Sequence, residues 1–222
     1  MSTDIIVSYD GTSNDDDALA LGKLLSRAGA TLGLAYVRHS REFDPRREEL
    51  AKHDAERRLE QGAAWLEDPE LPRHVVVSAS TGAGLAQLAH DEQASVIVFG
   101  SDYRTPPGRV EPGSSAQHLL EGGSVAIAVA PAGLRTDTRE RIESIAVLPQ
   151  DADSAARETA EALAGTLGAT FVTSETGVDL LVVGSRSSGP PGRVALGGAA
   201  RGHLSAARCA VLVVPYAQPA RF

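Results

Sequence analysis

The chain has 222 residues, of which 42% are hydrophobic and 23% are charged, and this ordinary globular composition excludes a disordered or fibrous protein. A net charge of −8 and an aromatic content of 4% speak against nucleic acid as a partner, because binding a phosphate backbone requires a basic face. The single cysteine excludes an internal disulfide. Because no apolar run approaches the roughly 18 residues of a membrane span and the N-terminus has no signal pattern, we expect a cytoplasmic protein with no membrane partner.

Apolar periodicity and turn residues predict alternating strands and helices along the first 131 residues. The expected strands cover residues 4–8, 31–37, 75–78, 96–99 and 125–129. The expected helices cover residues 13–28, 45–66, 84–91 and 114–120. Such alternation indicates a parallel sheet covered by helices on both faces, and therefore an α/β fold with an open, Rossmann-like sheet.

The first of these helices begins with acidic residues. Ser13 and Asp16 have the spacing of a capping box, and the run Asp15–Asp17 suits the positive end of the helix dipole. The same three carboxylates are a weaker candidate for a Mg²⁺ site, because the helix dipole already explains them. We therefore predict a structural role for the run and no protein metal site.

Two segments of the chain, residues 95–131 and 179–215, resemble each other at a constant offset of 84 positions. Each contains an apolar strand ending in Gly-Ser, the sequence PPGRV, a glycine that opens a helix, and a closing strand that ends in proline. We interpret this similarity as a tandem duplication.

The two copies are unequal in length. Residues 29–31 match residues 168–170 at an offset of 139, so the second copy lacks about 55 residues, or about two strands' worth of structure. The sequence therefore predicts a complete domain over 1–131, a linker over 132–141, and a shortened domain over 142–216.

Ligands of open α/β sheets bind beyond the carboxyl ends of the strands, where the strand order reverses. This rule places Asp10, Val37 and the loop after Gly100 around one crevice. Gly113 and the serines that follow it open a helix whose free amides and hydroxyls suit a phosphate group. The same serines also suit ordinary helix capping, so this feature leaves both interpretations open.

The spacing G-x2-G-x9-G-[S/T] is carried by Gly100, Tyr103, Gly113 and Ser114. On this pattern the chain resembles the tandem universal stress proteins, whose nucleotide-binding members carry it between the fourth strand and the fourth helix. The resemblance implies a sandwich of the adenine nucleotide alpha hydrolase type. It covers the whole first half, but in the second half only the two ends.

The resemblance also implies a ligand, ATP or a related adenine nucleotide, with Mg²⁺ when the nucleotide is bound. Asp10 matches the aspartate that contacts adenosine, and Val37 matches the valine whose backbone contacts adenine. Phe99 and Gly100 match the pair that flanks the nucleoside. The residues that match the phosphate-binding positions are Gly113, Ser114 and Ser115.

The pattern is incomplete in both halves. Tyr103 replaces the middle glycine, and Pro106 and Pro107 remove two backbone amides from the same loop. In the second half Ser187 replaces the middle glycine and Gly198 replaces the hydroxyl residue. We therefore expect no nucleotide site in the second half.

The two closing strands, residues 125–129 and 210–214, are rich in Val and Ala, and each would lie at a sheet edge that invites another strand. The resemblance implies dimerisation through this strand. We expect the two strands to pair within one chain as a pseudo-dimer, and a homodimer is the alternative. Cys209, directly before the second strand, is expected to be a small apolar residue.

Two classes of function remain open. The first is a non-catalytic regulatory protein of the stress response, in which ATP bound by the first half changes association with a protein partner. The second is a nucleotide-free interaction module of the same fold, whose pocket Tyr103 and the prolines close. An enzyme is the least supported class, because the sequence shows no set of acid, base and nucleophile, and hydrolysis of ATP would be slow.

Overall fold

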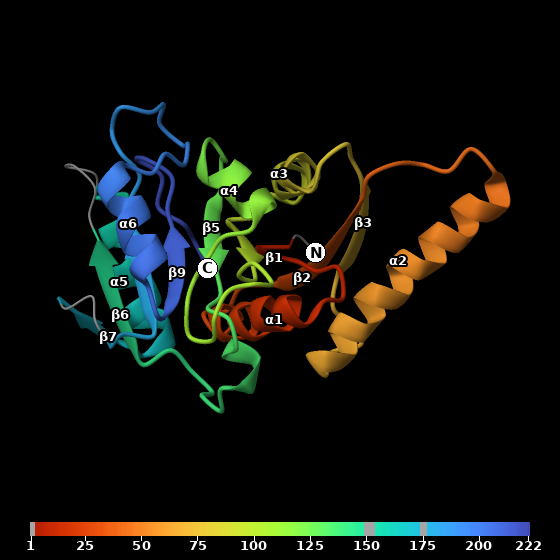
Figure 1. The fold of residues 1–222 in the computed structure, drawn as a ribbon. Helices are drawn as coiled ribbons and strands as arrows, with labels where there is room; N and C mark the ends of the chain where they lie inside the picture. The colour runs from red at the N-terminus through yellow and green to blue at the C-terminus, as the bar shows by residue number, and fades with distance from the viewer. Residues whose placement is uncertain (1–2, 149–153, 174–176) are drawn as a thin grey trace.

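The computed structural model describes residues 3–148, 154–173 and 177–222 (Figure 1). The strands are β1 (Ile5–Ser8), β2 (Leu32–Arg38), β3 (Arg73–Val77), β4 (Val96–Phe99), β5 (Ala126–Val129), β6 (Ser144–Leu148), β7 (Thr170–Val172), β8 (Leu180–Val183) and β9 (Ala210–Val213). The α-helices are α1 (Ser13–Ser26), α2 (Pro45–Trp65), α3 (Thr81–Glu92), α4 (Ser114–Leu120), α5 (Ala155–Leu167) and α6 (Gly198–Ala206), and a short 3-10 helix, η1, covers Leu134–Thr136.

The described strands form one sheet in the order β3-β2-β1-β4-β5-β9-β8-β6-β7. Neighbouring strands are parallel except β5 and β9, which are antiparallel, with Ala128 opposite Leu212. The two closing strands therefore pair with each other at the middle of the sheet. This pairing joins the two halves, and the free edges of the sheet are β3 and β7.

The order β7-β6-β8-β9 in the second half repeats the order β2-β1-β4-β5 of the first. The first half has α2, β3 and α3 between its second strand and β4, whereas residues 173–179 alone connect β7 to β8. The expectation that about two strands are missing is therefore wrong. One strand and two helices have no counterpart among the described residues, because the missing segment includes the helices on either side of β3.

Side chains of the sheet alternate between two cores. In β1, Ile5 and Val7 belong to the cluster that includes residues of α1, α2 and α5, and Ile6 belongs to the cluster beneath α3, α4 and α6. Helices therefore cover both faces, as Figure 1 shows for α1 below the sheet and for α3 and α4 above it. Burial on both faces explains why the strands are continuous apolar runs rather than alternating ones.

Residues 132–141 form hydrogen bonds and ion pairs with both halves of the chain. The buried carboxylate of Asp17 in α1 accepts hydrogen bonds from the Gly133 amide at 2.9 Å, the Arg135 amide at 2.8 Å and the Arg135 guanidinium at 2.8 Å. The expectation that Asp17 serves the helix dipole is therefore wrong. It lies on the inward side of α1 and anchors the segment that begins the crossing to the second half.

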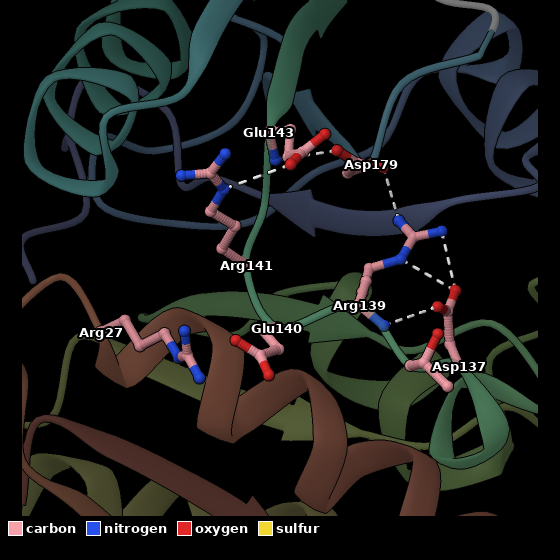
Figure 2. Close-up of a pocket in the computed structure, with 8 residues that line it drawn as sticks. Arg27, Asp137, Arg139, Glu140, Arg141, Glu143 and Asp179 are labelled. Carbon is pink, nitrogen blue, oxygen red and sulfur yellow. Dashed lines mark hydrogen bonds and ion pairs between the residues drawn. The ribbon is translucent and has the colours of Figure 1, made fainter.

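Farther along this segment, Arg139 forms ion pairs with Asp137 at 2.8 Å and with Asp179 at 2.5 Å (Figure 2). Asp179 directly precedes β8 and also accepts hydrogen bonds from the amides of Glu143 and Ser144, at 2.8 and 3.0 Å. These groups line a polar cavity of about 700 Å³ between the halves. Its charged side chains are largely paired with one another, so the cavity is part of the joint between the halves.

No helix within residues 3–148, 154–173 and 177–222 is both long and apolar enough to span a membrane.

Candidate functional site

A pocket of about 210 Å³ lies at the carboxyl ends of β1 and β2, where the sequence places the ligand crevice. It brings together Asp10, from the turn after β1, and Val37, from the end of β2. Side chains from α2 and from the start of α3 complete it. The full lining is Ser8, Tyr9, Asp10, Thr12, Ala35, Tyr36, Val37, His39, Arg58 and Thr81.

The turn between β1 and α1 is held by one carboxylate. Asp15 Oδ2 accepts hydrogen bonds from the Asp10 amide at 3.1 Å, the Thr12 amide at 3.0 Å and the Thr12 hydroxyl at 2.8 Å. Thr12 is the N-cap, so the capping box is formed by Thr12 and Asp15. The predicted box of Ser13 and Asp16 is wrong by one residue, because both Thr12 and Ser13 are good N-cap residues and the tertiary structure selects the first.

Arg58 closes one side of the pocket. Its Nη1 donates a hydrogen bond to the Asp10 carbonyl oxygen at 2.6 Å, and its guanidinium carbon lies 5.6 Å from the centre of the Tyr36 ring. This contact ties α2 to the turn after β1. It also gives the pocket a planar cation and an aromatic ring, groups that stack readily on flat ligands.

Carboxyl groups dominate the electrostatics at the start of α1. Burial, and then the neighbouring Asp10 carboxyl, raise the pKa of Asp15 to about 7. Burial is also the largest cause of the raised pKa of Asp16, and burial together with Asp16 and the other acids raises the pKa of Tyr9 to about 12. The nearby Asp10 carboxyl therefore disfavours a negative charge on Asp15.

The nucleoside-flanking candidates Phe99 and Gly100 lie at the end of β4, next to β1, and do not line the pocket. The Phe99 side chain is buried in the core beneath α3 and α4. A Cβ at Gly100 would lie 2.1 Å from the Asn14 carbonyl oxygen. Gly100 is therefore required by the close approach of α1, and its φ is not in the left-handed region.

The phosphate candidates lie beside the pocket, outside its lining. Gly113 is the N-cap of α4, and the hydroxyls of Ser114 and Ser115 make no hydrogen bond within the described part of the chain. A Cβ at Gly82 would lie 3.4 Å from the Ser115 carbonyl oxygen, and Gly82 follows Thr81, which lines the pocket. The first turns of α3 and α4 are therefore neighbours.

Some hydrogen bonds of the loop between β4 and α4 recur in the loop between β8 and α6. Ser101 Oγ donates to the Ala130 carbonyl oxygen at 2.7 Å, and Ser185 Oγ donates to the Val214 carbonyl oxygen at 2.7 Å. The amide of Gly108, in PPGRV, donates to the Ala132 carbonyl oxygen at 2.8 Å, as its counterpart Gly192 does to Tyr216 at 2.7 Å. The shared PPGRV thus forms a turn that is bonded to the residues after each closing strand.

Tyr103 projects from this loop. Its side chain is 70% exposed, and the Arg104 guanidinium carbon lies 4.9 Å from its ring centre. Tyr103 does not line the pocket of Asp10 and Val37. Hence the tyrosine does not close this pocket, contrary to the expectation attached to the nucleotide-free alternative.

Sequence reasoning named only Asp10 and Val37 of the pocket lining and missed the other residues, among them Arg58, Tyr36 and Thr81. Arg58 carries no local signal, because it is one of several charged residues on α2 and meets Asp10 only through the packing of α2. In the second half, the counterpart of the turn after β1 includes Asp151, which falls outside the described residues.

Comparison with known proteins gives one family match and several similar structures. The Universal stress protein family model matches residues 1–131. A universal stress protein from Archaeoglobus fulgidus DSM 4304 is 14% identical, with a TM-score of 0.70 over 97% of this chain and 99% of that chain. A functionally unknown protein from Pseudomonas aeruginosa PAO1 is 13% identical, with a TM-score of 0.61 over 97% of this chain and 93% of that chain.

No curated protein matches the chain. At these identities the solved structures show a shared fold, the open and mostly parallel α/β sheet that the sequence predicts. The family model covers more than half of the chain. Residues 1–131 contain the elements from β1 to β5. On this match, the chain belongs to the universal stress protein family.

Proposed function

We propose that this protein is a non-catalytic regulatory protein of the stress response that binds an adenine nucleotide, such as ATP, in its first half. The observation that carries the proposal is that Asp10 and Val37 line one pocket although they come from different strands. Arg58 and Tyr36 add a cation and an aromatic ring to the same pocket. Family membership supports the role in the stress response.

The size of the pocket favours a particular placement of the ligand. Its volume of about 210 Å³ is below the roughly 300–1,000 Å³ of typical sites for small molecules. The pocket therefore suits the nucleoside alone, and the phosphates would extend toward the start of α4. There the free hydroxyls of Ser114 and Ser115 and the amides of the first turn are suitable donors.

Mg²⁺ in this proposal accompanies the phosphates. Among the described residues there is no group of three His, Cys, Asp or Glu side chains that could hold a metal ion. Phosphate oxygens and water are the usual ligands of Mg²⁺ bound together with a nucleotide. A bound nucleotide would act by changing the association of the protein with a partner, and its hydrolysis would be slow.

The second candidate is a nucleotide-free interaction module of the same fold, in which the second half pairs with the first through β5 and β9. The carboxyls of Asp10, Asp15 and Asp16 favour it, because they lie near the pocket and oppose a triphosphate. The one guanidinium in the lining, that of Arg58, already donates to Asp10.

Isothermal titration calorimetry with ATP, ADP and adenosine in the presence of Mg²⁺ distinguishes the two candidates. We expect the wild-type chain to bind ATP, and Gly113→Val to weaken ATP binding by about tenfold or more, because the new side chain obstructs the first amides of α4. A Cβ at Gly113 meets no atom within 4 Å, so the variant should fold. Adenosine binding should be unchanged.

The matched control is Gly197→Val, at the N-cap of α6, which is the counterpart of Gly113 in the second half. ATP binding should be the same in this variant as in the wild type. If ATP produces no heat, or if Gly113→Val binds ATP as the wild type does, the nucleotide proposal is refuted and the interaction module remains.

A further inference from the structure

A second pocket, of about 380 Å³, lies in the second half between α6 and β8. We call it the α6–β8 groove. In Figure 1 α6 lies at the opposite end of the sheet from α2, and β8 lies between β9 and β6 in the strand order. The groove is lined by Gly177, Val178, Leu181, His203, Ala206, Ala207, Arg208 and Cys209.

The floor of the groove is apolar. Val178 and Leu181 are 7% and 3% exposed and belong to the core cluster beneath α3, α4 and α6. Cys209 packs against the same cluster, and burial raises the pKa of its thiol to about 11, so the sulfur is neutral at physiological pH. All three residues line the groove, so this end of the core borders an open pocket.

The equivalent place in the first half is covered by α3. The residues 84 positions before Val178, Leu181 and Cys209 are Ala94, Ile97 and Val125. These three belong to, or pack against, the cluster that holds Leu85 and Ala89 of α3. The helix also contacts α4, the counterpart of α6.

Among the described residues of the second half, no helix occupies this place. Residues 173–179 connect β7 to β8, and α3 alone has 12 residues. The groove is therefore the part of the helix-covered face that the shortening of the second copy leaves open. The first half shows what kind of element fits such a face.

The ends of the two surfaces also correspond. Gln93, the C-cap of α3, has a φ of 59°, and Gly177 at the matching position has a φ of 73°. Gly177 thus marks where the last turn of a helix placed like α3 would end. Arg208 lines the groove beside Gly177, whereas its counterpart in the first half is Ser124.

Arg208 is exposed and has no ion pair within the described parts of the chain. A cation is favourable at the C-terminal end of a helix, because the last carbonyl groups carry partial negative charge. One orientation of a bound helix therefore fits all of these features. Its C-terminal end would lie at Gly177 and Arg208, as the C-terminal end of α3 lies at Gln93.

We propose that the α6–β8 groove binds an amphipathic helix of a partner protein, placed as α3 is placed in the first half, with its C-terminal turn against Arg208. The buried face of that helix carries leucine together with alanine or glycine. In α3 these are Leu85 and Ala89, with Gly82 and Gly84, where a Cβ would lie 2.9 Å from the nearest neighbouring atom. Small residues let α3 lie close to its neighbours, and an amphipathic helix that lays its apolar face in a groove is a recurring mode of recognition.

The test uses a synthetic peptide of residues 80–93, which contains α3 and both of its caps, added to the full-length ¹⁵N-labelled chain. The changes in amide chemical shift should be concentrated at the groove, at Val178, Leu181, Ala206 and Cys209. They should saturate at about 1 mM peptide or below. A peptide of the same composition in scrambled order should cause no localised shifts.

Two pairs of variants separate groove binding from unspecific binding. Ala206→Arg places a large side chain in the groove and should weaken binding by about tenfold or more, whereas Ala162→Arg, on the exposed side of α5, should not. Arg208→Glu should weaken binding several-fold, and Arg46→Glu, at the start of α2, should not.

Spectra of the free variants verify that each one folds. The proposal is overturned if the peptide causes no shifts at the groove, or if Ala206→Arg binds the peptide as tightly as the wild type does. Both outcomes are independent of nucleotide binding, because the pocket of Asp10 and Val37 lies in the other half.

Discussion

The contact between α1 and the segment after β5 rests on one buried carboxylate, so Asp17→Ala should destabilise the protein strongly. The Asp17 side chain is 1% exposed and accepts three hydrogen bonds, two of them from backbone amides. Its removal leaves the amides of Gly133 and Arg135 without the buried acceptor that they share. Breaking a buried charged pair in this way costs about 3–5 kcal/mol.

Arg135→Ala provides the matched comparison. The Arg135 side chain is 33% exposed, and the carboxylate keeps both amide hydrogen bonds when the guanidinium is lost. Water can replace the guanidinium at this partly exposed position, so the expected cost is about 1 kcal/mol. The two variants should therefore differ by about 2 kcal/mol or more, although they remove opposite partners of one ion pair.

The assay is equilibrium unfolding in urea, followed by far-UV circular dichroism and by the fluorescence of Trp65, the single tryptophan. Coincidence of the two transitions verifies that unfolding is two-state. If Asp17→Ala loses no more stability than Arg135→Ala, the amides do not depend on the carboxylate, and this account of the contact is refuted.

Two further predictions concern a pair of glycine positions and the carboxyl of Asp15. Gly100→Ala should lower the free energy of unfolding by about 3 kcal/mol, because its Cβ would lie 2.1 Å from the Asn14 carbonyl oxygen. Gly165→Ala, inside α5 with no atom within 4 Å, should instead raise it by up to about 1 kcal/mol, and urea unfolding measures both. The raised pKa of Asp15, about 7 against an ordinary 3.8, means that the folded chain keeps a proton that the unfolded chain releases. The free energy of unfolding should therefore decrease from pH 3.8 to pH 7, and Asp15→Asn should reduce this decrease; an equal slope in both proteins would contradict the assignment.

Much of the local structure follows from the sequence. The strand predicted over 96–99 and the helix over 114–120 have the observed bounds, and α2 ends one residue before its predicted end. These elements have continuous apolar runs or clear caps, such as Asp44, which accepts hydrogen bonds from the Arg46 and Arg47 amides at the start of α2. The start of α3 is less well predicted, because its first turn contains glycine and only the Ser80 cap marks it.

The candidate site was predictable only in part. Asp10 and Val37 could be brought together from the sequence because strand ends in an open parallel sheet meet at one edge. The sequence could not place Arg58 in the same pocket, because the position of Arg58 depends on how α2 packs across the sheet. Phe99 and Gly100 have the spacing of a binding pattern, but their observed contacts are with the core and with α1.

The amino-acid sequence is sufficient to predict the α/β class, the alternation of elements and the internal repeat. These properties depend on periodicity and turn residues that act over short stretches of chain. Only the tertiary structure shows that Asp17 binds residues 133–135, that Arg58 bonds to Asp10, and that the α6–β8 groove is open. Each of these depends on groups far apart in the chain, which the packing of helices on the sheet brings together.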